Sequence, residues 1–338
     1  MSWASVTLGE VSTNIQTGPF GSQLHQSDYS DGGVPVVMPK DLVDGHISED
    51  SIARVSMSHV DRLSRHKIEI GDILYSRRGD VGRCAFATEV EQGWLCGTGC
   101  LCVTIDQSKA IPKFIFYQLQ KTETIGWVEK HAVGSTMLNL NTSILESVPI
   151  ELPSVAEQQM IVHVLSAYDD LIENNQKQIK LLEEAAQRLY KEWFVDLRFP
   201  GHETTPITNG LPEGWKKHKL PEIVSIMSGG TPKTDVKEYY GGSIPFYTPK
   251  DSNGLFFAFD TITHISQSGL NHCNSQYYPA DTVIITARGT VGKTTILAVP
   301  MAMNQSCYAL KCDKLNLPYY LFFSLNKEVT ALKTMANG

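Results

Sequence analysis

The sequence predicts an α+β protein in which two similar modules flank one long helix. Two observations predict this fold class: short blocks of residues occur twice in the same order, and the stretch between the two copies lacks glycine and proline from Val155 to Phe199. The 338 residues suffice for two or three domains that each have a core, and a chain that is 42% hydrophobic and 19% charged has the composition of an ordinary globular protein.

The internal repeat is the strongest signal in the chain. Four groups of residues return in the same order, namely Trp3, Leu8 and Glu10 as Trp215, Leu220 and Glu222, 33–41 as 243–251, 78–83 as 288–293, and 111–119 as 317–325. The offset between the copies falls from 212 to 210 to 206, which a few small insertions or deletions explain. Because the second copy ends opposite residues 133–134 of the first, we expect about one and a half repeats, with a second helix missing.

The segment between the copies has the spacing of a coiled-coil helix. Its apolar positions advance by alternating steps of four and three residues, which is the pattern of a helix-pairing seam. The seam consists of Ile161, Leu165, Tyr168, Ile172, Asn175, Ile179, Leu182, Ala186, Leu189 and Trp193. Ser154 is the expected N-cap, with Glu157 three residues later as the second half of a capping box. Asn175 either sets the register of the seam or faces water at a helix crossing.

Residues 287–294 imitate a phosphate-binding P-loop. Gly292-Lys293-Thr294 has the required ending, but Ala287 stands in place of the first glycine. The first copy has Arg83-Cys84 instead of Lys-Ser/Thr, and the residues after Lys293 are β-branched and typical of a strand rather than of the helix that a P-loop needs. We therefore expect hairpins, with strands at Ile73–Ser76 and Val283–Thr286. A nucleotide-hydrolysing enzyme is the disfavoured alternative, which nucleotide titration and Lys293→Ala would test.

Charge and cysteine usage exclude several classes of protein. The net charge of −7 argues against uniform phosphate attraction as the mode of DNA binding, although residues 200–338 carry a net charge of +2. Cys96, Cys100 and Cys102 lack metal-site spacing and are expected as small apolar residues of strands. No apolar run is long enough to span a bilayer, and no secretion signal opens the chain, so a cytoplasmic location without membrane contact is expected.

Several short motifs, in this order, resemble one known family over essentially the whole chain. These motifs are 17–22 (TGPFGS), 152–161 (LPSVAEQQMI), 199–203 (FPGHE), 211–215 (LPEGW) and 228–232 (SGGTP). The sequence resembles the DNA-specificity subunit of type I restriction-modification systems. The resemblance implies mixed α/β target recognition domains at 1–153 and 211–338, a coiled-coil-type spacer helix at 154–199 and a linker at 200–210.

The resemblance also implies a function and a set of partners. Each domain would read one half of a split double-stranded DNA site, and the helix would act as spacer and as docking surface for modification subunits, with restriction subunits as further partners. This chain would hold no catalytic residue, metal or cofactor, since S-adenosylmethionine and the adenine-methylating motif belong to the modification subunits. We also expect the unpaired helix seam to recruit a second copy of the chain.

Candidate DNA contacts come from the glycine loops, the Pro-Lys-Asp segments and the hairpin turns. They are Ser22, Gln23, Lys40, Arg77, Arg78, Arg83, Thr231, Lys233, Lys250, Asn253, Arg288 and Lys293. Modules that read different sequences should differ at base-reading positions, so shared residues are expected on phosphates or on internal carboxylates, with Asp41 and Asp251 as partners. Base readout is assigned to the unshared Gln23, Arg77, Lys233 and Asn253. A coiled-coil scaffold that binds only protein is the other alternative, and it would show no sequence-dependent DNA shift.

Overall fold

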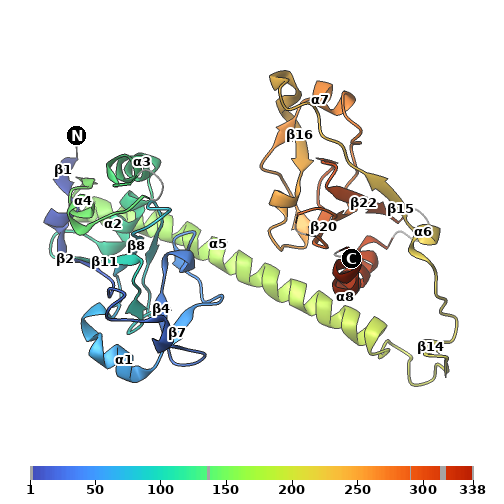
Figure 1. Ribbon diagram of the computed structural model, residues 1–338, viewed down its shortest axis with the longest axis horizontal. Helices are drawn as coiled ribbons and strands as arrows, with labels where there is room; N and C mark the ends of the chain where they lie inside the picture. The colour runs from blue at the N-terminus through green and yellow to red at the C-terminus, as the bar shows by residue number, and fades with distance from the viewer. Residues whose placement is uncertain (1–2, 135–137, 290, 313–316, 337–338) are drawn as a thin grey trace. The chain divides into compact units, whose positions relative to one another are not determined.

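The protein folds into two units, Met1–Glu173 and Asn174–Gly338, whose boundary falls inside one continuous helix. The computed structural model describes residues 3–134, 138–289, 291–312 and 317–336, and it describes the side chains as far as Val329 (Figure 1). In the description below, module 1 is the part of the first unit before the long helix, and module 2 is the part of the second unit after it.

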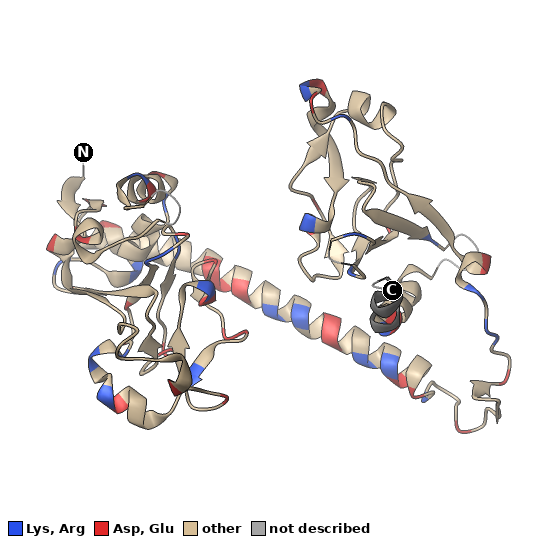
Figure 2. Ribbon diagram, viewed as in Figure 1, with Lys and Arg blue, Asp and Glu red and all other residues tan. Residues whose placement is uncertain are grey.

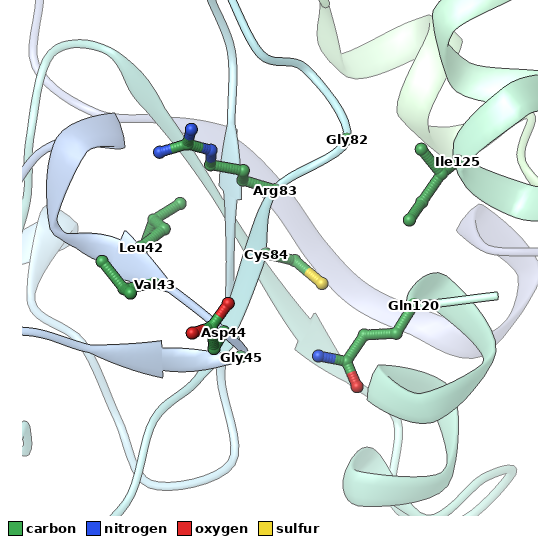
Figure 3. A pocket seen from close by; sticks show the side chains of 9 residues that line it. All are labelled: Leu42, Val43, Asp44, Gly45, Gly82, Arg83, Cys84, Gln120 and Ile125. Carbon is green, nitrogen blue, oxygen red and sulfur yellow. The ribbon is translucent and has the colours of Figure 1, made fainter. Parts of the chain in front are cut away.

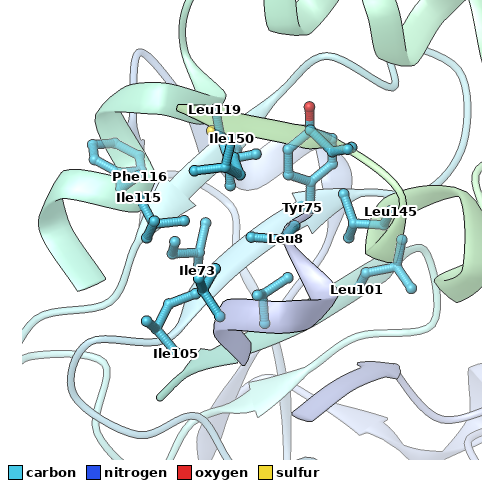
Figure 4. Close-up of a cluster of buried hydrophobic side chains, with 14 of the residues drawn as sticks. Leu8, Ile73, Tyr75, Leu101, Ile105, Ile115, Phe116, Leu119, Leu145 and Ile150 are labelled. Atoms are coloured by element: carbon cyan, nitrogen blue, oxygen red, sulfur yellow. The ribbon is translucent and has the colours of Figure 1, made fainter. Parts of the chain in front are cut away.

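An antiparallel sheet with the strand order β2-β11-β8-β9 forms the centre of module 1. Its strands are β2 (Ser12–Thr17), β8 (Ile73–Ser76), β9 (Cys84–Phe86) and β11 (Cys100–Ile105). Three helices and the β1-β12 pair pack on this sheet, namely α2 (Pro112–Leu119), α3 (Thr122–His131), α4 (Thr142–Glu146), β1 (Ala4–Thr7) and β12 (Pro149–Leu152). Leu8, Tyr75 and Leu101 are fully buried in the resulting core (Figure 4), and each such side chain contributes about 1.5–3 kcal/mol by leaving water.

A second, smaller layer completes module 1. It contains a sheet with the order β10-β4-β7-β3, the β5-β6 pair and the short helix α1. The bounds are β3 (Tyr29–Ser30), β4 (Val34–Val37), β5 (Leu42–Val43), β6 (His46–Ile47), β7 (Ala53–Val55), β10 (Leu95–Cys96) and α1 (Met57–Arg62). The expectation for the cysteines is confirmed, because Cys96, Cys100 and Cys102 are buried strand residues, and burial raises the pKa of each thiol.

Module 2 repeats this plan. Its main sheet has the order β15-β22-β19-β20-β17, and a second sheet has the order β18-β16-β21. The strands are β15 (Ser225–Ser228), β16 (Tyr240–Tyr247), β17 (Phe257–Ala258), β18 (His264–Ile265), β19 (Val283–Thr286), β20 (Thr294–Leu297), β21 (Ala302–Met303) and β22 (Cys307–Lys311). The helices are α6 (Leu220–Ile223), α7 (Gln267–Asn271) and α8 (Pro318–Ala336), and β13 (Ile207–Thr208) pairs with β14 (Leu211–Pro212) before them.

Strand register confirms that the two modules are copies of one fold. Ile73 lies opposite Phe86 in module 1, and Val283 lies opposite Ile296 in module 2. Both residues of the pair therefore have the same offset of 210 positions between the modules. The modules differ at their carboxyl ends. The helices α2 and α3 of module 1 are separate, whereas α8 runs without a break through the equivalent region of module 2.

The hairpin prediction is confirmed at both sites. The strands β8 and β19 have the expected bounds, and each pairs antiparallel with the strand that follows. Gly79 and Gly289 have φ of 77° and 79°, the left-handed conformation that glycine adopts without strain. Lys293 is followed by β20 and not by a helix, so the P-loop likeness does not correspond to a P-loop fold; Thr290 lies outside the described residues.

The predicted spacer helix forms α5 (Val155–Tyr190), followed by a π-helical turn over Lys191–Val195. Its capping box is present, because Glu157 Oε2 accepts a hydrogen bond from Ser154 N at 3.0 Å and Glu157 N donates one to Ser154 Oγ at 3.4 Å. Residues 196–199, which were expected to be helical, lie beyond the last helical turn. None of the helices in the described ranges combines the length and the apolar character needed to cross a bilayer.

Both ends of α5 contact a module within their own unit. Gln158 is fully buried and joins the start of the helix to module 1, since its side chain accepts a hydrogen bond from Ile111 N and donates one to Pro153 O, both at 2.9 Å. In the second unit, Glu183 Oε1 accepts a hydrogen bond from Phe256 N at 2.9 Å, and the rings of Tyr190 and Phe323 stack at 5.3 Å. The helix is therefore anchored by side chains near each end.

Candidate nucleic-acid interface

Four loops of module 1 meet where the central strands end. We call them the tip surface of module 1, and they comprise residues 18–23, 38–41, 77–80 and 97–99. Backbone hydrogen bonds hold them together, because Gly97 N donates to Val37 O at 2.8 Å and Arg77 N donates to Gly99 O at 2.9 Å. The candidates Ser22, Gln23, Lys40, Arg77 and Arg78 all lie on this surface.

Module 2 has the same frame. Its tip surface comprises residues 229–233, 248–251, 287–289 and 304–306. Asn304 N donates to Tyr247 O at 3.0 Å, and Ala287 N donates to Ser306 O at 2.7 Å. The two bonds join residues that are equivalent, by the offsets of the repeat, to the residues joined in module 1. The candidates Thr231, Lys233, Lys250 and Arg288 lie on this surface.

One glycine in each module allows two of the tip loops to approach each other. A Cβ added to Gly18 would lie 1.9 Å from Gly97 O, and a Cβ added to Gly229 would lie 2.2 Å from Asn304 O. Neither distance is compatible with a side chain. Glycine at these positions is therefore required by packing, and the shared frame is set by the backbone.

Side chains on the two frames differ. In module 1 the guanidinium carbon of Arg77 lies 6.0 Å from the centroid of the Phe20 ring, which is 51% exposed. The Arg77 Nε is buried and has no hydrogen-bond partner in the described part of the chain. In module 2 the equivalent positions hold Ala287 and Thr231, and Thr231 Oγ1 instead donates a hydrogen bond to Gln305 Oε1.

Lys40, Asp41 and Asp251, which belong to the repeated Pro-Lys-Asp segments, make hydrogen bonds inside their own modules. Lys40 Nζ donates to Asp41 Oδ1 at 2.6 Å and to Ser51 O at 2.8 Å, so Lys40 pairs with a buried carboxylate. The Asp41 Oδ2 accepts a hydrogen bond from Met38 N at 2.8 Å. Asp251 accepts the equivalent bond from Thr248 N at 2.8 Å. Both aspartates therefore shape their loops.

Other candidates have local partners or lie exposed. Gln23 Oε1 accepts a hydrogen bond from Phe20 N at 3.0 Å and thereby closes the glycine loop. Asn253 Oδ1 accepts one from Leu255 N at 3.1 Å. The candidates on the tip surfaces that are solvent-exposed are Ser22, Lys40, Arg78, Thr231, Lys233, Lys250 and Arg288.

Arg83 and Lys293 line cavities beside the tip surfaces. Arg83 and Gln120 line a cavity of about 370 Å³ in module 1 (Figure 3), into which the Gln120 amide and the Cys84 thiol point. Lys293 and Asn326, at the equivalent positions of module 2, line a cavity of about 840 Å³. Arg83 Nε donates to Asp80 Oδ2 at 2.6 Å, and Lys293 Nζ donates to Ser252 O at 3.3 Å. Arg83 is therefore bonded to a tip residue, and Lys293 is bonded to the residue that follows the tip segment 248–251.

Most of the predicted seam of α5 is exposed. Ile161 packs against the core of module 1, and Trp193 lies partly buried in the π-helical turn. Asn175 is exposed, and the exposed large apolar members of the seam are Leu165, Tyr168, Ile172, Ile179, Leu182 and Leu189. Charged residues of both signs share the helix (Figure 2). An apolar row of this kind indicates a surface for a partner.

Phe20 and Gln305 are missing from the sequence-based set of candidates. Phe20 belongs to the glycine-loop motif but is not polar, and Gln305 lies in a loop whose sequence, Asn304-Gln305-Ser306, does not resemble Gly97-Thr98-Gly99. The signal that locates Gln305 is the offset of 207 between β11 and β22, which places it opposite Thr98.

Comparison with known proteins places this architecture. Residues 1–184 and 212–338 match the family model described as type I restriction modification DNA specificity domain. The HindI specificity subunit of Haemophilus influenzae is 23% identical over 403 aligned positions, covering 99% of this chain and 85% of that protein. The MjaIX specificity subunit of Methanocaldococcus jannaschii is 31% identical over 234, covering 66% and 52%. The crystal structure of a type I system S subunit from M. genitalium matches with a TM-score of 0.59 and 16% identity, covering 99% and 79%.

Proposed function

This chain belongs to the family of type I restriction-modification DNA specificity subunits, and on that premise we propose that its two tip surfaces each read one half of a bipartite double-stranded DNA target. The chain is a non-catalytic subunit that supplies DNA specificity, and catalysis resides in its partner subunits. The proposal concerns which surfaces carry that specificity and how the target is divided between them.

The proposal rests on one observation: the tip loops of both modules share one backbone arrangement but present different side chains. The same backbone hydrogen bonds hold the loops of both modules, while Phe20 and Arg77 are replaced by Thr231 and Ala287. A protein that reads two different short sequences needs one way of docking on DNA and two ways of contacting base edges. Exposed cations shared by the modules, such as Arg78 and Arg288, would bind phosphates and fix the register.

We assign the long helix two roles, as a spacer and as a docking surface. Half-sites at a fixed separation require readers at a fixed separation, and a continuous helix supplies it. The exposed apolar residues of α5 would bind the modification subunits, which would contribute S-adenosylmethionine, and restriction subunits would join the same assembly. Because the target is genomic DNA, we place this assembly in the cytoplasm.

Self-association through α5 is a second proposal, supported by the alternating spacing of its exposed seam. The mass of the purified chain at tens of micromolar tests it. A dimer that dissociates when Ile172 and Ile179 are both changed to Lys would support helix pairing, and a strict monomer would contradict it.

Sequencing of methylated bases in the DNA of a host that carries the complete system tests the assignment of half-sites. Changing Arg77 and Arg78 to Ala should alter one half of the methylated motif, and changing Lys233 and Arg288 to Ala should alter only the other half. Lys130→Ala, at an exposed position on α3, is the control. The proposal is wrong if both double variants alter the same half, or if the wild-type motif is not bipartite.

A further inference from the structure

The two modules use one equivalent loop position for different side-chain pairs. Phe20 lies two residues after Gly18, the glycine of module 1 that packs on a neighbouring loop. Thr231 lies two residues after Gly229, the equivalent glycine of module 2. Phe20 contacts Arg77 of the hairpin turn. Thr231 contacts Gln305 of the opposite loop. Each pair occurs once, because Ala287 stands at the position of Arg77 and Thr98 stands at the position of Gln305.

In each pair, the contact restricts the conformations of the side chain that carries the hydrogen-bonding groups. The ring of Phe20 supports one face of the Arg77 guanidinium, and the Thr231 hydroxyl holds one lone pair of the Gln305 amide oxygen. A polar side chain that is already oriented loses less conformational freedom when it binds. The bond to Thr231 uses only the amide oxygen of Gln305. Among the described residues of module 2, its NH₂ has no hydrogen-bond partner, so it remains available to a base edge.

We propose that Gln305, oriented by Thr231, is a specificity-determining residue of module 2 and selects adenine, while Arg77, supported by Phe20, selects guanine in the half-site of module 1. The inference deepens the proposed function and depends on it. A glutamine amide matches the N6 donor and N7 acceptor of adenine, and a guanidinium matches O6 and N7 of guanine. Thr231 is a positioning residue, because it acts through Gln305.

The test uses the full chain assembled with its modification and restriction subunits in the host, with sequencing of methylated bases as the readout. Gln305→Ala should reduce discrimination at one A·T pair of the module 2 half-site by about tenfold. Gln305→Glu keeps the length of the side chain and removes its donor, so it should lose the same discrimination even if the Ala variant folds poorly. Gln267→Ala, at an exposed position on α7 where the Gln267 amide donates to Asn271 Oδ1, should change nothing.

Thr231 has its own readout. Thr231→Val should weaken discrimination at the same A·T pair by less than Gln305→Ala does, and Thr231→Ser should restore it, because serine keeps the hydroxyl. A purely structural role for Thr231 would weaken methylation at all sites together.

The outcomes separate this inference from the proposed function. If the motif stays bipartite and each half follows one module, but Gln305→Ala leaves the module 2 half intact, alters a G·C pair or weakens all sites equally, the assignment of Gln305 is wrong and the division of the target stands. If variants of both modules alter the same half, the division itself is wrong.

Discussion

Arg77 lies over the ring of Phe20, with its guanidinium carbon 6.0 Å from the ring centroid and its Nε buried without a hydrogen-bond partner among the described residues. A contact with a ring face uses none of the N–H donors of the guanidinium, which are the groups that a guanine edge would bind.

Arg77→Ala should therefore relax one base position at a cost of about 1–3 kcal/mol, measured as the affinity of the assembled complex for DNA sites that differ at single base pairs. Arg78→Ala is the matched control, because Arg78 is exposed and shared with Arg288. It should weaken binding to all sequences alike and make the dependence on salt concentration shallower. If Arg77→Ala behaves as Arg78→Ala is expected to, Arg77 contacts phosphate.

Gly18 and Gly21 belong to one loop but differ in the space around them. A Cβ at Gly18 would collide with Gly97 O, whereas nothing lies within 4 Å of a Cβ at Gly21. Gly18→Ala should force the loop away from 97–99 and abolish discrimination in the half-site of module 1, while Gly21→Ala should retain it. Competition binding with mismatched duplexes measures both effects. Normal discrimination by Gly18→Ala would show that the packed frame is not needed for readout.

The sequence predicts the repeated frame well because the repeat aligns residues that have the same physical task. Strand bounds at Ile73–Ser76 and Val283–Thr286 follow from apolar runs ended by glycine turns, and the Ser154–Glu157 box follows from local spacing. Lys40 and Asp41 are neighbours in the sequence, so their pairing can be predicted from local spacing as well. By contrast, the contact of Thr231 with Gln305 joins residues 74 positions apart. No local pattern predicts such a contact, since it depends on how two loops pack. The placement of Arg83 beside Gln120 and of Lys293 beside Asn326 has the same cause.

Gln158 is fully buried at the junction of module 1 and α5, where it bonds to Ile111 N and Pro153 O. Gln158→Ala should destabilise the first unit by about 1–3 kcal/mol, because it leaves two buried backbone groups without partners. Chemical denaturation, followed by tryptophan fluorescence, measures the loss. The exposed neighbour Gln159 provides the matched substitution, and Gln159→Ala should have almost no effect. Equal losses for both variants would show that the hydrogen bonds of Gln158 are not the cause, because alanine itself favours the helix.

Tyr117 on α2 donates a hydrogen bond of 2.5 Å to Asp169 on α5. Burial, followed by this bond to Asp169, raises the pKa of Tyr117 to about 12. Because the folded-state pKa lies above the unfolded value near 10, the stabilisation is complete below pH 10 and is lost as the pH rises from 10 to 12. The difference in unfolding free energy between wild type and Tyr117→Phe should shrink across that interval.

Asp169→Asn separates the two causes of the Tyr117 shift. It removes the negative charge and keeps a hydrogen-bond acceptor, so the folded-state pKa of Tyr117 should fall, and the loss of stability above pH 10 should be smaller and end at a lower pH than in the wild type. Denaturation curves at half-unit steps of pH would show the change, and identical curves for wild type and Asp169→Asn would assign the raised pKa to burial alone.

The boundary between the two units passes through α5, between Glu173 and Asn174. Each module thus stabilises only the half of the helix that it touches, and a short exposed helix is marginally stable by itself. When heat opens one module, the adjacent half of α5 should unwind toward its middle, while the other half should stay packed on its own module. Each reading domain and its half of the helix should therefore melt as one unit.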